Sequence, residues 1–116
     1  MITAEEAKRQ STIAIEKEKE ENFNFIIEDI DKEIQKAIKK GYTSIYYDIT
    51  QLVDTMKVRE YLLSYGYLCN IINEMGSLSF RISWKEPELG RKEYEVIKAN
   101  AKLSQLLFNF DNLEVK

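Results

Sequence analysis

Residues 67–84 read YLCNIINEMGSLSFRISW, and this stretch predicts a β-hairpin. Its second half alternates between apolar and polar residues, which is the period of a strand with one buried face. The apolar set is Leu78, Phe80, Ile82 and Trp84, and the polar set is Ser79, Arg81 and Ser83. Residues 67–72 form the preceding strand, and segment 73–77, which contains a glycine, supplies a five-residue connection. We therefore expect an antiparallel hairpin with one apolar face.

The residues before the hairpin predict a strand followed by a helix. Residues 43–49 (TSIYYDI) are rich in β-branched and aromatic residues, as strands are. A helix follows that begins near Thr50 or Asp54 and ends before Gly66, with Val58, Tyr61, Leu62 and Tyr65 at helical spacing. A strand–helix–strand unit favours a right-handed crossover between parallel strands. Together with the hairpin, this order predicts a three-stranded mixed sheet.

The first 40 residues predict one long helix. Thr3 and Glu6 have the spacing of a capping box, and Lys39-Lys40-Gly41 is typical of a helix end. The second half carries a core-facing stripe of Phe23, Ile26, Ile27, Ile30, Ile34, Ala37 and Ile38. A continuous helix would be about 55 Å long, whereas a compact domain of this size is roughly 35 Å across. The helix therefore either breaks within residues 16–22 or projects from the core.

The chain as a whole is predicted to be an α+β domain of order αβαββα with a long N-terminal helix. A last helix over residues 91–108 has one apolar side formed by Val96, Ala99, Leu103, Leu106, Leu107 and Phe110. We divide the chain into an N-terminal helical arm (1–22), an α/β core (23–86), and a C-terminal helix and tail (87–116), which together make one folded domain. The first two helices are expected to pack on one face of the sheet.

The residue types present argue against catalysis. The 116 residues include no histidine and one cysteine, Cys69, so the common catalytic bases and structural zinc sites are excluded. No glycine-rich phosphate loop occurs, and we expect neither a cofactor nor a metal. A carboxylate site formed by Asp48, Asp54 and Glu74 is conceivable, but such residues more often cap helices and form turns. Cys69 lies in an apolar strand and is interpreted as a buried thiol.

Charge and hydropathy argue against nucleic acid and membranes as binding partners, so we expect the partner to be a protein. With 17 basic and 20 acidic residues the net charge is −3, which makes nucleic-acid binding unlikely. There is no apolar stretch long enough to cross a membrane and no secretory signal at the N-terminus, so we expect a cytoplasmic or virion location.

Two surfaces are candidates for an interface. The N-terminal arm has a face of small residues, Ala4, Ala7, Ser11 and Ala14, which could serve as an oligomer seam or docking arm or could be a solvated helix. Tyr46 and Arg81 point away from the apolar side of the sheet and could form an aromatic and cationic patch. The alternative is that the C-terminal helix covers this face, since a sheet tends to have a layer on each side.

Four motifs resemble a loose class of small proteins encoded by tailed phages. They are the opening Ile2-Thr3-Ala4-Glu5-Glu6-Ala7, Gly41-Tyr42-Thr43-Ser44-Ile45, Leu63-Ser64-Tyr65-Gly66-Tyr67 and the closing Ile82-Ser83-Trp84. The resemblance covers residues 2–84, and the residues from Lys85 onward depart from it. It implies either a virion component or an antagonist of host defence, and it assigns no site residue.

The sequence thus leads to two hypotheses. The first is a non-enzymatic structural or assembly protein, a phage virion accessory that oligomerises or docks through its N-terminal helix. The second is a small binding protein that inhibits a host defence enzyme or sequesters a nucleotide signal.

Overall fold

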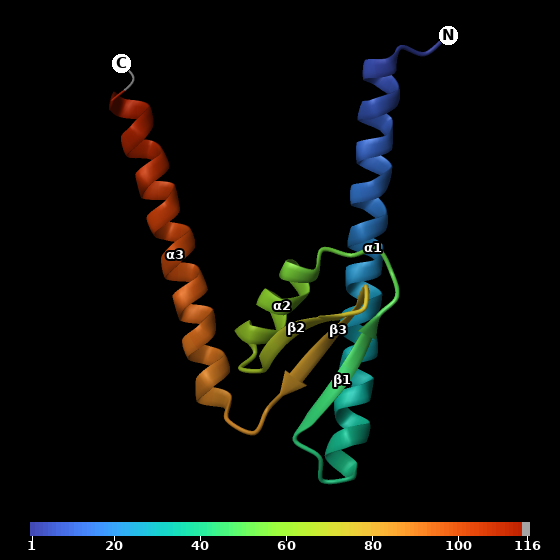
Figure 1. The fold of residues 1–116 in the computed structure, drawn as a ribbon, viewed down its shortest axis with the longest axis vertical. Helices are drawn as coiled ribbons and strands as arrows, with labels where there is room; N and C mark the ends of the chain where they lie inside the picture. The colour runs from blue at the N-terminus through green and yellow to red at the C-terminus, as the bar shows by residue number, and fades with distance from the viewer. Residues whose placement is uncertain (115–116) are drawn as a thin grey trace.

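The chain folds into three helices and a three-stranded sheet. The structure is a computed structural model that describes the backbone of residues 1–114 and the side chains of residues 1–109 (Figure 1). The elements follow the predicted order: α1 (Ala4–Lys39), β1 (Ser44–Ile49), α2 (Thr55–Ser64), β2 (Leu68–Glu74), β3 (Ser77–Ser83) and α3 (Pro87–Glu114). The α+β class and the long N-terminal helix are confirmed.

The sheet is antiparallel throughout, so the prediction of a mixed sheet is wrong. Its strand order is β1-β3-β2, and β3 pairs antiparallel with both neighbours. β1 and β2 do run in the same direction, but β3 lies between them and takes the hydrogen bonds that a parallel pair would have made. Polar and apolar residues alternate strictly along β3, and its Phe80 and Ile82 are fully buried, which suits the central position.

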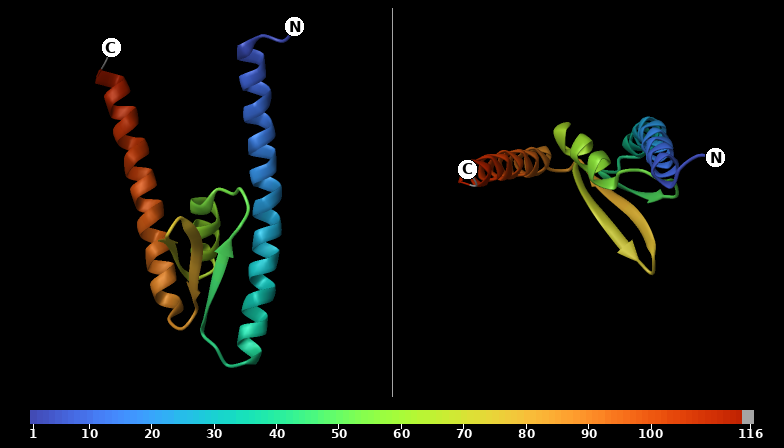
Figure 2. Two further views of the ribbon diagram at one scale, coloured as in Figure 1. Left: turned by 45° about the vertical axis from the view of Figure 1, so that its right-hand side comes forward. Right: turned by 90° about the horizontal axis from the view of Figure 1, so that it is seen from above.

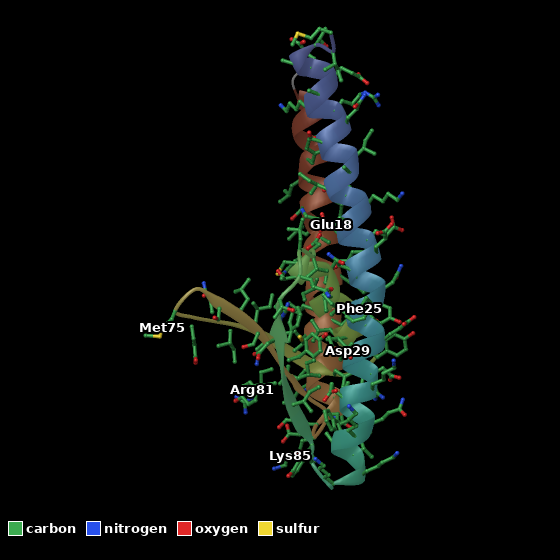
Figure 3. All side chains as sticks on the ribbon, turned by 90° about the vertical axis from the view of Figure 1, so that its right-hand side faces the viewer. Glu18, Phe25, Asp29, Met75, Arg81 and Lys85 are labelled. Atoms are coloured by element: carbon green, nitrogen blue, oxygen red, sulfur yellow. The ribbon has the colours of Figure 1, made fainter. Side chains whose placement is uncertain are left out.

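The hairpin turn is shorter than predicted. β2 ends at Glu74 and β3 begins at Ser77, so Met75 and Gly76 alone connect them. Both residues have positive φ, 53° and 82°, as a type I′ turn requires. This turn matches the twist of the two strands, which therefore stay paired up to the turn. Figure 3 shows Met75 at the tip of a hairpin that extends well away from the helices.

The core lies between the inner face of the sheet and the helices α1 and α2. Its buried members are Ile26, Ile30, Ile34, Val53, Val58, Leu62, Cys69, Phe80 and Ile82. Because residues of α1 and α2 share one cluster with the inward side chains of β2 and β3, both helices pack on the same face. The view from above shows the helices on one side of the sheet only (Figure 2).

Two glycines end the first two helices. Gly41 and Gly66 have φ of 79° and 89°, in the left-handed region that glycine adopts readily because it has no Cβ. After each glycine, the next backbone N–H turns back to the helix, Tyr42 to the carbonyl of Ala37 at 3.0 Å and Tyr67 to that of Leu62 at 3.1 Å. These Schellman-type ends confirm the predicted stops and direct the chain into β1 and β2.

α3 does not cover the second face of the sheet. It begins at Pro87, earlier than the predicted residue 91, because proline is favoured in the first helical turn. Its first turns pack beside α2 and β2. The contact is close at Gly90, where an added Cβ would lie 2.4 Å from the carbonyl oxygen of Gly66. This contact fixes the root of α3 at the side of the helix layer and leaves the outer face of the sheet open.

The molecule is far from spherical. Its extents are 56 × 44 × 26 Å and its radius of gyration is 18.3 Å, against about 13 Å for a compact chain of this length. The cause is visible in Figures 1 and 2, where the first half of α1 and the second half of α3 extend past the sheet at the same end of the molecule. The core therefore occupies only the opposite end, and two helical arms rise from it.

Candidate functional site

The first arm is the outer half of α1, residues 4–21. The helix is continuous from Ala4 to Lys39, so of the two alternatives left by its length, the projecting helix is the one found. Thr3 caps it, with Oγ1 accepting from the N–H of Glu6 at 3.2 Å. The Glu6 carboxylate does not return to the cap as in a full capping box. It accepts from Arg9 Nε at 2.9 Å and from Gln10 Nε2 at 3.1 Å.

The predicted small-residue face of this arm is exposed. Ala4, Ala7, Ser11 and Ala14 lie along one line of the helix, and all four are exposed. Around them the surface is charged, with ion pairs of one helical turn such as Lys19–Glu16. Three larger apolar residues accompany them, Ile2, Ile13 and Ile15. Because the residues of this face are small and those around it are mostly charged, the face offers close approach but little hydrophobic driving force.

The second arm is the outer part of α3, from Val96 onward, and it is much more apolar. Val96, Leu103, Leu106, Leu107 and Phe108 are each 56–61% exposed. The predicted apolar side of the last helix included these residues, except Phe108, and this side is exposed over the described part of the chain. The predicted side also included Phe110, whose side chain lies outside the described residues. Beyond its root, α3 has no other element of the chain beside it (Figure 1).

The outer face of the sheet brings Tyr46 and Arg81 together. The two residues are directly opposite each other in the β1–β3 register, and Asn70 of β2 completes the row. Tyr46 is 66% exposed and Arg81 is exposed. The side chain of Arg81 points away from the helices in Figure 3. The aromatic and cationic patch exists as a surface, and it is separate from the small-residue face of α1.

A groove between α1 and α2 was not foreseen. The groove has a volume of about 340 Å³. Tyr61, Tyr65 and Tyr67 line it together with apolar residues of α1, and the acidic residues Glu28 and Asp31 also border it. Tyr61 packs edge-on against Phe23, with ring centroids 5.6 Å apart. The sequence placed Tyr61 and Tyr65 on the buried side of α2, whereas Tyr65 is 67% exposed. The sequence feature that could have indicated this groove is the high number of tyrosines, seven in the chain.

The carboxylates considered for catalysis do not form a site. Asp54 is the N-cap of α2, where Oδ1 accepts from the N–H of Lys57 at 3.2 Å. Asp48 belongs to β1 and Glu74 to the end of β2, and the central strand β3 separates them. Within the described residues, no three His, Cys, Asp or Glu side chains are grouped so as to hold a metal ion.

Three partly buried hydrogen bonds hold the core elements together. Arg59 of α2 donates from Nε to the carbonyl of Cys69 at 2.9 Å and from Nη2 to Glu93 of α3 at 2.6 Å. The Tyr47 hydroxyl of β1 donates to Asp29 of α1 at 2.7 Å. Burial, with this hydrogen bond and the negative charge of Asp29, raises the pKa of Tyr47. These contacts are structural and lie away from both arms.

Cys69 is an inert core residue. It is fully buried, and burial raises the pKa of its thiol to about 12, although the nearby Arg59 charge acts in the opposite direction. A thiol that is both protonated and inaccessible is a poor nucleophile. The geometry supports the interpretation of Cys69 as a small hydrophobic residue.

Comparison with models of protein families, with curated proteins and with solved structures gave no match. Among the described residues, no helix combines the length and apolar character needed to cross a lipid bilayer.

Proposed function

We propose that this chain is a non-catalytic assembly protein that acts through its two helical arms, as a virion accessory component of a tailed phage. The observation that carries the proposal is the exposed apolar surface of α3, where five large side chains are each more than half exposed. A single protein seldom keeps so many large apolar side chains exposed on one helix unless another protein covers them.

The geometry of the arms supports the same function. Each arm extends about 25 Å beyond the core at 1.5 Å per residue, and both project at the same end of the molecule (Figure 1). With the core at one end and two projecting helices at the other, the chain can contact other proteins of an assembly through these helices while its core stays folded. The phage setting comes from the resemblance of residues 2–84.

Mass spectrometry of purified particles from the phage that encodes the chain tests the proposal. We expect the chain in the particles at a fixed ratio to other virion proteins. A matched variant with Leu103→Lys and Leu106→Lys should remain folded but be depleted from particles. If the wild-type chain is missing from particles, the virion role is refuted.

A second candidate function follows from the open sheet face. The row of Tyr46, Arg81 and Asn70 presents an aromatic ring, a guanidinium and an amide on a surface with no covering layer. Such a row suits a protein inhibitor or a nucleotide-binding protein directed against host defence. The double variant Tyr46→Ala, Arg81→Ala should abolish protection of the phage from the host if this function holds, and an unchanged infection would refute it.

A further inference from the structure

The exposed residues of α3 follow a heptad pattern. Val96, Ala99, Leu103 and Leu106 are spaced by three, four and three residues, and the sequence continues this spacing to Phe110 and Leu113. Apolar residues repeated every 3.5 positions are the signature of a helix that pairs lengthwise with another helix. We call the line of Val96, Ala99, Leu103 and Leu106 the α3 seam.

The α3 seam faces away from the body of its own chain. At the root of α3, Gly90 is buried and Tyr94 and Ile97 are half-buried, so these residues mark the side that packs on the core. With about 100° between successive residues, the four seam positions lie roughly 100–180° around the helix from Ile97. Within residues 1–114, the elements that pack on α3, namely α2 and β2, therefore lie on the side of the helix away from the seam.

We propose that the α3 seam is covered by the α3 seam of a second copy of this chain. The proposal rests on the proposed assembly function and names its first partner. Because each seam lies opposite the body, two copies can bring their seams together while their bodies point outward, as a two-fold symmetric dimer requires. An isologous contact of this kind closes on itself and does not propagate into a fibre.

The charges beside the seam permit self-pairing. Side chains at the flanking e and g positions determine which helices pair. Those positions hold Glu93, Glu95, Asn100, Lys102, Leu107 and Asn109. Glu93 is already ion-paired with Arg59, and the remaining charges, Glu95 and Lys102, cancel. A strongly charged partner would gain nothing from such flanks, whereas a second copy meets no net repulsion.

The small size of the seam indicates a dimer of low affinity. From Val96 to Leu106 the seam is about 15 Å long and about 10 Å wide on each copy. This footprint belongs to the class of interfaces below roughly 1,200 Å², which are typical of reversible complexes. We therefore expect a weak, reversible dimer, which forms where assembly raises the local concentration.

Sedimentation equilibrium of the full chain tests this proposal. Over about 5 µM to about 1 mM, the mass should rise reversibly from one chain to two. Leu103→Lys and, separately, Leu106→Lys should raise the dissociation constant at least about 10-fold, because each puts a charge in the seam. Phe108→Lys is the matched control. It is equally exposed, but it lies about three turns after Ile97, on the other side of the helix, and should leave the dimer intact.

Three results would overturn the proposal: a monomer throughout the concentration range, a dimer that survives both seam variants, or a dimer that Phe108→Lys disrupts as much as they do. Circular dichroism of each variant confirms that the fold is retained. The test is separable from that of the proposed function. A chain that stays monomeric but is found in particles refutes only the dimer, and a dimer that is missing from particles refutes only the virion role.

Discussion

The inner half of α1 and the outer part of α3 carry the same kind of apolar stripe in opposite surroundings. Ile26, Ile30 and Ile34 of α1 are 1–3% exposed beneath the sheet, whereas Val96, Leu103 and Leu106 of α3 are 56–58% exposed. Only the first stripe is buried within the chain, and it therefore stabilises its helix there, whereas the second stripe remains in contact with water. An apolar stripe thus predicts that a helix has a partner surface, and only the tertiary structure shows whether that surface belongs to the same molecule.

The largest effect should come from truncating one residue of each stripe. Ile30→Ala removes a side chain that is 1% exposed and should lower the free energy of unfolding by about 2–5 kcal/mol, through lost burial and the cavity that remains. Leu103→Ala should change it by less than about 0.5 kcal/mol at concentrations where the chain is monomeric. Urea denaturation monitored by the single tryptophan, Trp84, measures both values. Equal losses would show that α3 is packed within the chain.

The root of α3 offers a second test of where the packed region ends. Gly90→Ala would place a Cβ 2.4 Å from the Gly66 carbonyl oxygen, so the helix must shift off α2. Alanine normally favours a helix by about 1 kcal/mol over glycine, yet here we expect a net loss of roughly 1–3 kcal/mol. The control is Asn100→Ala on the exposed part of α3, which should be neutral or slightly stabilising. A stabilised Gly90→Ala variant would mean that α3 is not held at this contact.

The sequence predicted the elements well and their partners poorly. The ends of α1 and α2 were predicted correctly because glycine and capping signals are local: Gly41, Gly66 and Asp54 act on their own backbone neighbours. The prediction of a mixed sheet was wrong because whether β3 pairs on one edge or two depends on contacts between distant segments. The partner of the apolar side of α3 could not be predicted for a similar reason, since helical spacing is identical for a buried stripe and an intermolecular seam.

The candidate surfaces show the same limit. Tyr46 and Arg81 were correctly placed on one face by alternation along their strands, and the register brings them opposite each other. Whether α3 covered them could not be derived, because it depends on the contact of Gly90 with Gly66. The tyrosine groove was missed because Tyr61 and Tyr65 have the spacing of core residues, and the phenol ring is apolar enough to fit either location.

High pH should weaken the contact between the inner half of α1 and the sheet. The pKa of Tyr47 is raised in the folded chain by burial and by Asp29. A group whose pKa is higher when folded contributes stability below its unfolded pKa, near 10 for tyrosine, and loses that contribution as pH rises above it. Unfolding curves between about pH 8 and pH 11 should show a smaller decline for Tyr47→Phe than for the wild type. Tyr46→Phe on the open face is the control and should follow the wild type.

The smallest expected changes in stability come from removing the N-cap residues of α1 and α2, which compares the polar arm with the core. Asp54 caps α2, which is part of the core, so Asp54→Ala should lower the free energy of unfolding by about 1 kcal/mol. Thr3 makes the equivalent bond to Glu6 at the tip of α1, about 27 Å of helix away from the core. Thr3→Ala should therefore fray the first turns and lower the helical circular dichroism, while the Trp84 unfolding curve stays in place. If Thr3→Ala instead shifts that curve as far as Asp54→Ala does, the arm and the core unfold as one unit. The exposed outer half of α1 would then be coupled to the buried half through the rigidity of the helix, and a partner bound at the tip would stabilise the core from a distance.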